Sequence, residues 1–550
     1  MPADANAAAM LQESAALSGA PWVRPLVTAF TTQYPSVASL FAGNPADPRA
    51  WKETIARVQQ SPRNRAALAA ALTRQLEQRN APAPAREAAA SLARPDTVAV
   101  VTGQQAGAFG GPLYSLLKAV TALQLAKRVR EEHGTPAVTV FWVDAEDHDW
   151  EEVRMAHVLD RDFSLVDVAI DPPPGAGDRS IGALQLTEGV ATAIDALERT
   201  LPPTEFTAEV ITALRARYRA GETMAQAFAG WIDDLLGQHG LITFDASDAS
   251  VKPLVAEVFR CELDHPSMTA KLAREAGDVM AHLGHEPQVQ PAEDGVALFY
   301  MDGAGRRPVK RRNGEYVIGD TRRSPAELAG EATANPERFS PNVLLRPLVQ
   351  DRLFPTICYV AGPAELAYQA QLGQVYRAFE LEAPLLYPRA SVTLLDSAAA
   401  KFLERSHLPI ESLAVQDDSV LNKLLEQHLP PDIERAVAEI ERVVGTESAR
   451  LRQAVGTVDP TLAGAVDTTA DRVRDTLKHL HNKIVQASKR KDDTLRRQFA
   501  RTRALTFPGG QPQQRVLNIA FFANRYGLTI ADRLIEVLPL RTDRHFLVTL

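Results

Sequence analysis

The stretch Val101–Lys118, VTGQQAGAFGGPLYSLLK, holds four glycines, two adjacent glutamines and a lysine between an apolar run and a helix-like segment. At such a junction, unpaired backbone N–H groups and the helix dipole favour an anion. Gln104 and Gln105 could add neutral donors, and Lys118 could add a positive charge. The spacing matches neither G-x-x-x-x-G-K-[ST] nor G-x-G-x-x-G. Two interpretations therefore remain: a cradle for phosphate, or glycines that let a helix and a strand pack closely.

A cluster of acids follows a second apolar run, in the sequence VDAEDHDWEEV at 143–153. In a parallel sheet, ligands bind at the carboxyl edge of the strands, which is where this cluster is expected to lie. His148 or Asp147 could act there as a general base or acid, and the carboxylates could hold Mg²⁺. The alternative is an acidic helix N-terminus, because Asp and Glu stabilise a first helical turn.

A third set of polar residues surrounds the apolar run PTICYVAGP. Arg346 and Gln350 precede this run, Glu365 follows it, and Arg389 ends the next apolar run along the chain. Arginines at a strand edge could bind a carboxylate or a phosphate bidentately. They could equally pair with neighbouring acids of their own chain.

Two strand–turn–helix–strand units must position these residues. DTVAVVTG is a short β-branched run that ends at Gly103, the apolar residues after Pro112 recur at helical spacing, and AVTVFWVD is the next strand. PTICYVAGP, AELAYQAQLGQVYRAFE and APLLYPR repeat the order strand, helix, strand. Units of this kind imply a parallel sheet, so we expect an α/β fold.

The segments outside the two units differ in character. The first hundred residues contain helix formers, as in AALAAALTRQLEQRN. Between the units, LITFD predicts a further strand, and VALFYMDGAGRRPVKRRNGEYVIGD predicts turns that link short antiparallel strands. We interpret the segments between the units as insertions in the α/β core.

After Arg389 the pattern changes to heptads. Apolar residues recur every three, four or seven positions from Ile433 to Val455, and the pattern continues from Leu477 to Phe499 after a break at GTVDPTLAG. Charged residues fill the positions between them, which predicts an antiparallel helical hairpin or coiled coil. An ordinary helical bundle shares this pattern, but the length and charge density favour the coiled coil.

The composition is typical of a soluble globular protein, with 45% hydrophobic and 23% charged residues. A chain of 550 residues exceeds what one core normally holds, so several domains or a core with large insertions are expected. The net charge of -8 argues against a general nucleic-acid binder, and no apolar run is long enough for a membrane span. We expect no secretory signal, and the two distant cysteines predict neither a disulfide framework nor a zinc site, which favours the cytoplasm.

Taken in order, these blocks resemble the bacillithiol biosynthesis cysteine-adding family. The resemblance rests on VTGQQAGAFGGPLYSLLKA, VFWVDAEDHDWEEV, NVLLRPLVQDRLFPTICYVAGPAELAYQAQL, PLLYPRASVTLLD and PGGQPQQRVLNIAFFANRYG, and extends from about residue 97 to the C-terminus. One departure is Gln514, which stands before Arg515 where the family pattern leads us to expect an acid.

The resemblance implies a Rossmann-like core with two connective insertions and a coiled coil used in dimerisation. It implies a ligase-type enzyme that adds cysteine to the amine of glucosaminyl-malate in the last step of bacillithiol biosynthesis. The expected partners are these two small molecules and a second copy of the chain, without nucleic acid or membrane. ATP or ADP and Mg²⁺ are candidate cofactors, and no zinc is expected. The alternatives are a nucleotidyl-transferring or adenylate-forming enzyme on another small substrate, and a non-catalytic dimeric coiled-coil scaffold.

The same blocks assign roles to individual residues. His148 and Asp147 are expected to be catalytic, and no metal ligand is assigned. The expected substrate-binding residues are Gln104, Gln105, Tyr114, Glu146, Asp149, Asn342, Arg346, Gln350, Glu365, Tyr368 and Arg389. The expected nucleotide-binding residues are Gly103, Gly107, Gly110, Gly111 and Lys118.

The expected partition of the chain has six parts. They are an N-terminal helical part of the core (1–95), a first Rossmann-like half (96–160), connective insertions with intervening core strands (161–340), a second Rossmann-like half (341–400), a helical coiled coil (401–510) and a C-terminal segment that packs back on the core (511–550).

Overall fold

The computed structural model describes residues 11–303, 305–427, 431–491 and 493–550. The chain forms two compact units. Residues up to Leu394 form the first unit together with Gln511–Leu550, and Leu395–Gly510 form the second. The first unit contains every residue that the sequence assigned to a site.

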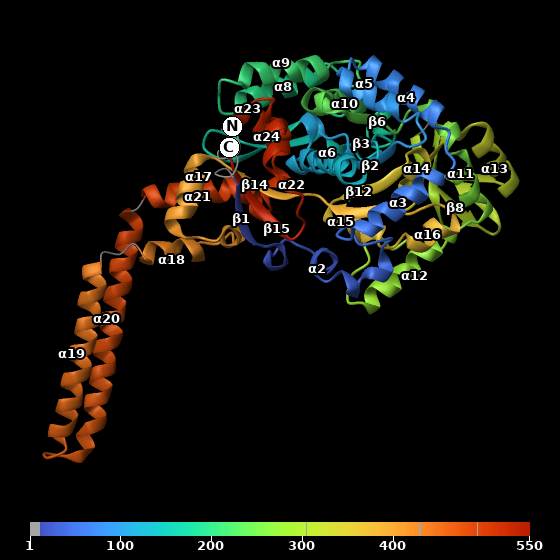
Figure 1. Cartoon of the computed structure of the whole chain (residues 1–550). Coiled ribbons are helices and arrows are strands. Elements are labelled where there is room, and N and C mark those ends of the chain that lie inside the picture. Colours follow the sequence, from blue (N-terminus) through green and yellow to red (C-terminus); the bar gives the residue numbers. More distant parts are fainter. Residues whose placement is uncertain (1–10, 304, 428–430, 492) are drawn as a thin grey trace. The chain divides into compact units, whose positions relative to one another are not determined.

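A five-stranded parallel sheet lies at the centre of the first unit (Figure 1). Its order is β13 (Leu385–Pro388), β12 (Thr356–Ala361), β2 (Val98–Gln105), β3 (Ala137–Asp144) and β6 (Leu241–Asp245). The chain runs from β2 to β3 and β6 on one side, whereas β12 and β13 lie on the other side of β2. The strand order therefore reverses between β2 and β12, and in open α/β sheets a crevice forms at such a reversal.

Helices cover both faces of this sheet. One face is covered by α3 (Pro48–Gln60), α6 (Leu113–His133) and α10 (Met224–Leu236), and the other by α4 (Arg65–Gln78), α5 (Ala83–Ser91) and α14 (Arg346–Leu353). The helices that join β12 to β13 are α15 (Pro363–Gln369) and α16 (Gly373–Ala378). Both predicted βαβ units and the α/β fold class are thus confirmed.

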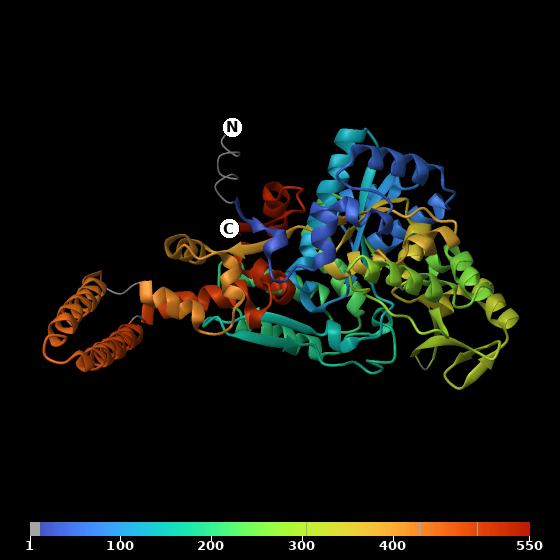
Figure 2. The same cartoon turned by 90° about the horizontal axis from the view of Figure 1, so that it is seen from below.

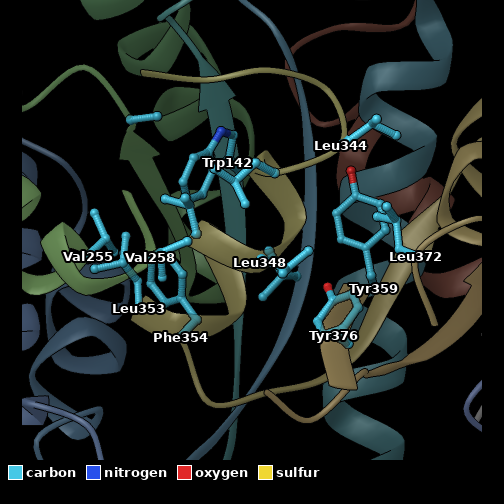
Figure 3. Packing of buried hydrophobic residues seen from close by; sticks show 14 of the residues in the cluster. Trp142, Val255, Val258, Leu344, Leu348, Leu353, Phe354, Tyr359, Leu372 and Tyr376 are labelled. Atoms are coloured by element: carbon cyan, nitrogen blue, oxygen red, sulfur yellow. The ribbon is translucent and has the colours of Figure 1, made fainter. Parts of the chain in front are cut away.

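The side chains of β2 alternate between the two faces. Val98 and Val100 pack with α3 and α6, whereas Ala99 and Val101 pack in the cluster of α4, α5 and α14. Figure 3 shows part of that second cluster, in which Trp142 of β3 lies near Phe354, with ring centroids 6.4 Å apart. Because both faces are buried, the strand reads as one continuous apolar run.

The segments between the core strands form separate small structures. Between β3 and β6 lie α7 (Trp150–Val153), the hairpin of β4 (Met155–Leu159) and β5 (Leu165–Ala169), the 3-10 helix η5 (Ile181–Ala183), α8 (Gly189–Thr200), α9 (Thr207–Arg217) and η6 (Gly237–His239). Between β6 and β12 lie η7 (Ala249–Leu254), α11 (Ala256–Asp264), α12 (Met268–His282), α13 (Pro325–Ala334) and η8 (Pro336–Arg338).

The predicted antiparallel strands of the second insertion are also confirmed. They form a five-stranded sheet with the order β10 (Thr321–Arg323), β9 (Glu315–Ile318), β8 (Gly305–Arg312), β7 (Gly295–Asp302) and β11 (Phe339–Pro341). Figure 2 shows this sheet and the β4–β5 hairpin along the lower edge of the first unit. We call the five strands the inserted sheet.

The two ends of the first unit meet in a third sheet. β1 (Leu11–Ala16), β15 (Arg544–Thr549) and β14 (Ser391–Leu395) pair in that order. Short elements complete both ends: η1 (Leu17–Gly19), α2 (Pro25–Thr32), η2 (Tyr34–Ser36) and η3 (Ala38–Leu40) near the N-terminus, and α22 (Gln513–Val516), α23 (Ile519–Tyr526) and α24 (Ile530–Val537) near the C-terminus.

The second unit is helical. It contains α17 (Ser397–Ser406), η9 (Ile410–Ala414), α18 (Ser419–Gln427), α19 (Pro431–Val455), η10 (Pro460–Leu462), α20 (Ala463–Lys491), α21 (Asp493–Thr506) and η11 (Pro508–Gly510). Both views show α19 and α20 side by side as a hairpin (Figures 1 and 2), in agreement with the predicted coiled coil. Residue 492, inside the predicted second arm, lies outside the described residues.

The single helix predicted from the segment AELAYQAQLGQVYRAFE is wrong, because α15 ends at Gln369 and α16 begins at Gly373. Gln371, in the turn between them, is buried, and its Nε2 donates to the backbone oxygens of Ala273 and Val289. Tertiary hydrogen bonds of this kind leave no trace in the helical period of the sequence.

Candidate functional site

A pocket of about 520 Å³ opens at the carboxyl edge of the parallel sheet, at the reversal between β2 and β12. Four neighbouring strands contribute: Gly103 and the two glutamines end β2, Asp144 ends β3, Gly362 follows β12 and Arg389 follows β13. The other lining residues are Tyr114, Lys118, Glu152, Gln288, Val289, Val343, Arg346, Pro363, Ala364, Glu365, Tyr368 and Arg515. The structure thus brings residues as far apart in the sequence as Gly103 and Arg515 into one pocket.

Lys118 and Glu365 form a buried ion pair in the wall of this pocket. Nζ of Lys118 lies 2.5 Å from Oε2 of Glu365, and it donates to the backbone oxygen of Gly103 at 2.7 Å and to Oε1 of Gln104 at 3.0 Å. Burial lowers the pKa of Lys118, against the effect of Glu365. Burial would raise the pKa of Glu365, but Lys118 together with hydrogen bonds from Tyr359 and the Gly362 amide holds this pKa below its ordinary value. These three acceptors use all three N–H donors of the ammonium. Lys118 therefore holds Glu365, Gly103 and Gln104 together and has no donor left for a phosphate.

Arg346 and Asp144 form a second, longer ion pair at the pocket. Nε of Arg346 lies 3.5 Å from Oδ2 of Asp144, and Nη2 donates to the hydroxyl of Tyr368 at 2.6 Å. Burial raises the pKa of Asp144, although Arg346 opposes this shift. A carboxyl with a raised pKa at a ligand pocket is suited to proton transfer.

The two adjacent glutamines are held by different partners. Nε2 of Gln104 donates to the hydroxyl of Tyr114 at 3.2 Å, and its Oε1 accepts from Lys118. Nε2 of Gln105 donates to Oδ2 of Asp147 and to Oε2 of Glu152, each at 2.9 Å. Both side-chain amides are therefore oriented by the protein before any ligand binds.

Two arginines at the pocket lack an acidic partner: no carboxylate of the described residues lies within ion-pair distance of Arg389 or Arg515. Nη1 of Arg389 donates to Oε1 of Gln514 at 2.6 Å, and its guanidinium lies 5.5 Å from the ring centroid of Tyr114. Burial lowers the pKa of Arg389. Because Gln514 is neutral, it orients Arg389 without cancelling its charge, which leaves both cations for an anionic ligand.

The remaining glycines of the first motif do not line the pocket. The amide of Gly110 donates to the hydroxyl of Tyr218 at 3.1 Å and to the oxygen of Gly107, and the amide of Gly111 donates to the oxygen of Ala108. Gly110 has φ +97°, and a Cβ there would lie 2.8 Å from Trp231. The phosphate-cradle interpretation does not fit Gly107, Gly110 and Gly111, whereas the close-packing interpretation does.

His148 and Asp147, the predicted catalytic pair, also lie outside the pocket lining. Nδ1 of His148 lies 3.4 Å from Nη1 of Arg306, and the imidazole is 39% exposed. Burial would raise the pKa of Asp147, but hydrogen bonds from the His148 amide and Gln105, with the charge of Arg306, hold it below its ordinary value. Asp147 contacts the pocket lining through Gln105, whereas Asp144 lines the pocket itself.

Two further acids of this cluster have structural contacts. Glu146 forms a buried ion pair with Lys252, which also donates to a backbone oxygen, so Glu146 does not reach the pocket. Asp149 accepts from the amide of Glu152 at 3.1 Å and caps α7. The alternative of an acidic helix N-terminus therefore describes Asp149 correctly.

Asn342 and Gln350 were expected to bind substrate, but neither lines the pocket. Oδ1 of Asn342 accepts from the amides of Leu344 and Leu345 and so starts the turn that leads into α14. Gln350 is buried, and its Nε2 donates to Asp351 at 3.0 Å. Asn342, Arg346 and Gln350 lie in the same sequence motif, and the motif alone does not show that only Arg346 lines the pocket.

The sequence did not assign several of the lining residues. Asp144 was visible as the last residue of an apolar strand, and its place at the carboxyl edge was the available signal. Glu152 and Arg515 lay inside recognised motifs without a role. Gln288, Val289 and Val343 lie outside regular elements, where no periodicity could place them.

Comparison with known proteins decides the family. The profile described as "Bacillithiol biosynthesis BshC, N-terminal Rossmann-like domain" matches residues 12–390, and "Bacillithiol biosynthesis BshC, C-terminal coiled-coil domain" matches residues 392–550. This chain belongs to the BshC family. The resemblance seen in the sequence is thereby confirmed, and the BshC coiled-coil profile covers both α19 and α20.

Curated BshC relatives match along the length of the chain. The protein from Salinibacter ruber is 32% identical over 549 residues, which is 100% of both chains. The protein from Symbiobacterium thermophilum is 32% identical over 87% of this chain and 88% of its own, and that from Koribacter versatilis is 31% identical over 80% and 81%. All three carry the name "Putative cysteine ligase BshC".

Within the described parts of this BshC chain, no group of three or more His, Cys, Asp or Glu side chains is arranged to hold a metal ion. None of the described helices combines the length and the apolar character of a bilayer span. The pocket thus combines arginines, oriented side-chain amides and, in Asp144, a carboxyl whose pKa burial raises.

Proposed function

We propose that this protein is a ligase-type enzyme that joins cysteine to the amine of glucosaminyl-malate, the last step of bacillithiol biosynthesis. One observation carries the proposal: a single pocket holds two arginines without acidic partners beside a carboxyl whose pKa burial raises. Glucosaminyl-malate carries two carboxylates and an amine, which match these groups. The names of the relatives support the ligase class.

In the proposed reaction the arginines of the pocket bind the substrate, and the carboxyl of Asp144 transfers a proton. Arg389 and Arg515 bind the malate carboxylates through charge-assisted hydrogen bonds. Asp144 accepts the proton that the sugar ammonium must lose before its nitrogen can attack the cysteine carbonyl. The carbon–nitrogen bond then forms as a carbon–oxygen bond of the cysteine carboxyl breaks; in the net condensation the ammonium and the carboxylate give the amide and one water, or the oxygen would leave with the activating group where one had been attached.

A free carboxylate is a poor acyl donor in water, so that oxygen must leave in an activated form. ATP with Mg²⁺ is the candidate activator. The amides of Gly110 and Gly111 and the ammonium of Lys118 are bonded within the protein, so these three predicted nucleotide-binding residues have no donor left for a phosphate. We therefore assign no step to a nucleotide, and the assay decides whether one is required.

The test is a thiol-product assay with purified protein, glucosaminyl-malate and cysteine, with and without ATP and Mg²⁺. Bacillithiol formation, identified by mass spectrometry, supports the proposal, and the nucleotide requirement separates ligation from other chemistry. A protein that binds neither substrate and forms no thiol under either condition would exclude this function.

We also propose that the chain forms a homodimer through the α19–α20 hairpin. Ile440, Val443 and Leu451 on α19, and Val473 and Leu480 on α20, are large apolar side chains that remain exposed. Exposed apolar residues at heptad spacing favour association with another helix pair. Sedimentation velocity should give twice the chain mass, and Leu451→Lys with Leu480→Lys should give a monomer.

A further inference from the structure

Asp147 lies outside the pocket, yet both of its oxygens belong to a chain of contacts that reaches it. Oδ1 accepts from the amide of His148 at 2.8 Å and from the guanidinium of Arg306 at 3.3 Å. Oδ2 accepts from Nε2 of Gln105 at 2.9 Å, and the same nitrogen donates to Glu152. The contacts therefore run from Arg306 through Asp147 to Gln105, which lines the pocket.

Arg306 is fixed by the inserted sheet from which it comes. Its Nε donates to the hydroxyl of Ser340 at 3.0 Å, and its Nη2 donates to the backbone oxygen of Pro341 at 3.1 Å. The guanidinium lies 3.7 Å from the ring centroid of Phe299, and the side chain is only 8% exposed. The planar guanidinium of Arg306, on β8, is thus held by contacts with residues of β7 and β11. Its Nη1 faces the carboxylate of Asp147.

This arrangement decides which end of the Gln105 amide faces a ligand. Ionised carboxylates only accept hydrogen bonds, so the two acids, Asp147 and Glu152, must both receive N–H groups of Gln105. Oε1 of Gln105 has no hydrogen-bond partner among the described residues. The side chain that the sequence predicted to be a donor therefore presents an acceptor.

We propose that Oε1 of Gln105 is a binding point for an ammonium or hydroxyl group of a substrate, and that Arg306 is the positioning residue that maintains it through Asp147. The identity of that group rests on the proposed function: it belongs to the amino sugar of glucosaminyl-malate or to the amine of cysteine. Arg306 itself does not line the pocket.

Two variants and one control test the chain of contacts from Arg306 to Gln105. Arg306→Gln removes the positive charge that faces Asp147. Asp147→Asn is nearly isosteric, but its amide nitrogen meets that of Gln105, so the Gln105 amide turns its oxygen toward residue 147. Arg307→Gln is the matched control, because Arg307 lies on the same strand and pairs with Asp302 at 3.9 Å.

Crystal structures and steady-state kinetics provide the two measurements. In Asp147→Asn the Gln105 amide should be rotated, in Arg306→Gln the Asp147 carboxylate and the Gln105 amide bonded to it should be displaced, and in both variants KM for one of the two substrates should rise about 10-fold. The substrate affected identifies the bound group. Arg306→Lys should restore part of the loss, and adding Gln105→Leu to Arg306→Gln should raise KM no further, which a purely structural role of Arg306 would not produce. The control should behave as wild type.

An unchanged Gln105 amide in the Asp147→Asn structure would overturn the positioning role, whether or not Arg306→Gln folds. Unchanged KM values for both substrates would overturn the binding point. If the wild-type protein makes no bacillithiol, the proposed function fails separately. A glucosamine soak then decides the inference: an ammonium or hydroxyl within hydrogen-bond distance of Gln105 Oε1 supports it, and no such contact refutes it.

Discussion

The ammonium of Lys118 lies 2.5 Å from the carboxylate of Glu365. Lys118 belongs to α6, which follows β2, and Glu365 belongs to α15, which follows β12. This ion pair therefore joins the two Rossmann-like halves at the reversal where the pocket opens. Glu365 also accepts from the amide of Gly362 at 2.7 Å, so the same carboxylate caps α15.

Removing one member of this pair should be costly. Lys118→Met leaves a carboxylate that is only 17% exposed without its cation, and the expected loss in free energy of unfolding is about 3–5 kcal/mol. The double variant Lys118→Met with Glu365→Gln should recover part of this loss, because no charge is then left buried alone. Chemical denaturation measures both values, and equal losses in the single and double variants would contradict the argument.

Asp144 should be the proton acceptor in the proposed reaction. Asp144→Asn keeps the shape of the side chain but cannot take a proton, so kcat should fall by about 10²–10⁴-fold with an unchanged fold. His148→Gln serves as the comparison, and its kcat should stay within about 3-fold of wild type, because His148 does not line the pocket. The reverse ranking of the two variants would return the role to His148.

Arg515 should contribute to substrate affinity without contributing to stability. Its side chain is exposed and has no carboxylate of the described residues within ion-pair distance, so Arg515→Gln should leave the unfolding midpoint unchanged. KM for glucosaminyl-malate should rise about 10-fold to 100-fold as a charge-assisted hydrogen bond is lost. Arg533→Gln, an exposed change on α24 away from the pocket, is the control. Competition by malate should weaken in the first variant only.

The stability of the first unit should depend on pH through Glu262. Burial raises the pKa of this carboxyl to about 7, and its partners are the Thr269 hydroxyl and the Ala297 amide, with no cation. As pH rises from about 4.5 to about 7, the unfolded chain ionises while the folded state keeps its proton. Stability that is fully present below pH 4.5 is therefore lost across this interval.

Glu262→Gln removes this titration. The variant should gain stability relative to wild type as pH rises, by about 3 kcal/mol at pH 8. Tryptophan fluorescence during denaturation isolates the relevant unit, because all five tryptophans precede Leu394. A difference between variant and wild type that does not change from pH 4.5 to pH 8 would show that Glu262 titrates normally.

The fold could be predicted largely from the sequence because several of its core strands contain continuous apolar runs that lead into a glycine or an acid. Val98–Gln105 and Ala137–Asp144 are examples, and both end at the pocket. The helical hairpin was equally visible, because its heptads are local in sequence. The break after Gln369 was not visible, because a tertiary contact of Gln371 produces it.

The site could be predicted only as a region. Motif position placed Lys118, Arg346 and Arg389 at the right edge of the sheet, but it could not show which polar atoms were already used. Lys118 has all its donors engaged, whereas Arg389 has no acid of the described residues within ion-pair distance. Hydrogen-bond satisfaction is a property of three-dimensional contacts, and no spacing rule reports it.

The glycine turn that failed as a phosphate cradle has a consequence for how the chain is made. The amide of Ile519 donates to the oxygen of Gly111, the amide of Leu113 donates to Leu517, and Asn518 donates to the oxygen of Ala108. This turn is therefore completed by a segment that the ribosome synthesises four hundred residues later, after the helical hairpin. Arg515, which lines the pocket, belongs to the same late segment, so a nascent chain can form its parallel strands earlier but completes the pocket only near the end of translation.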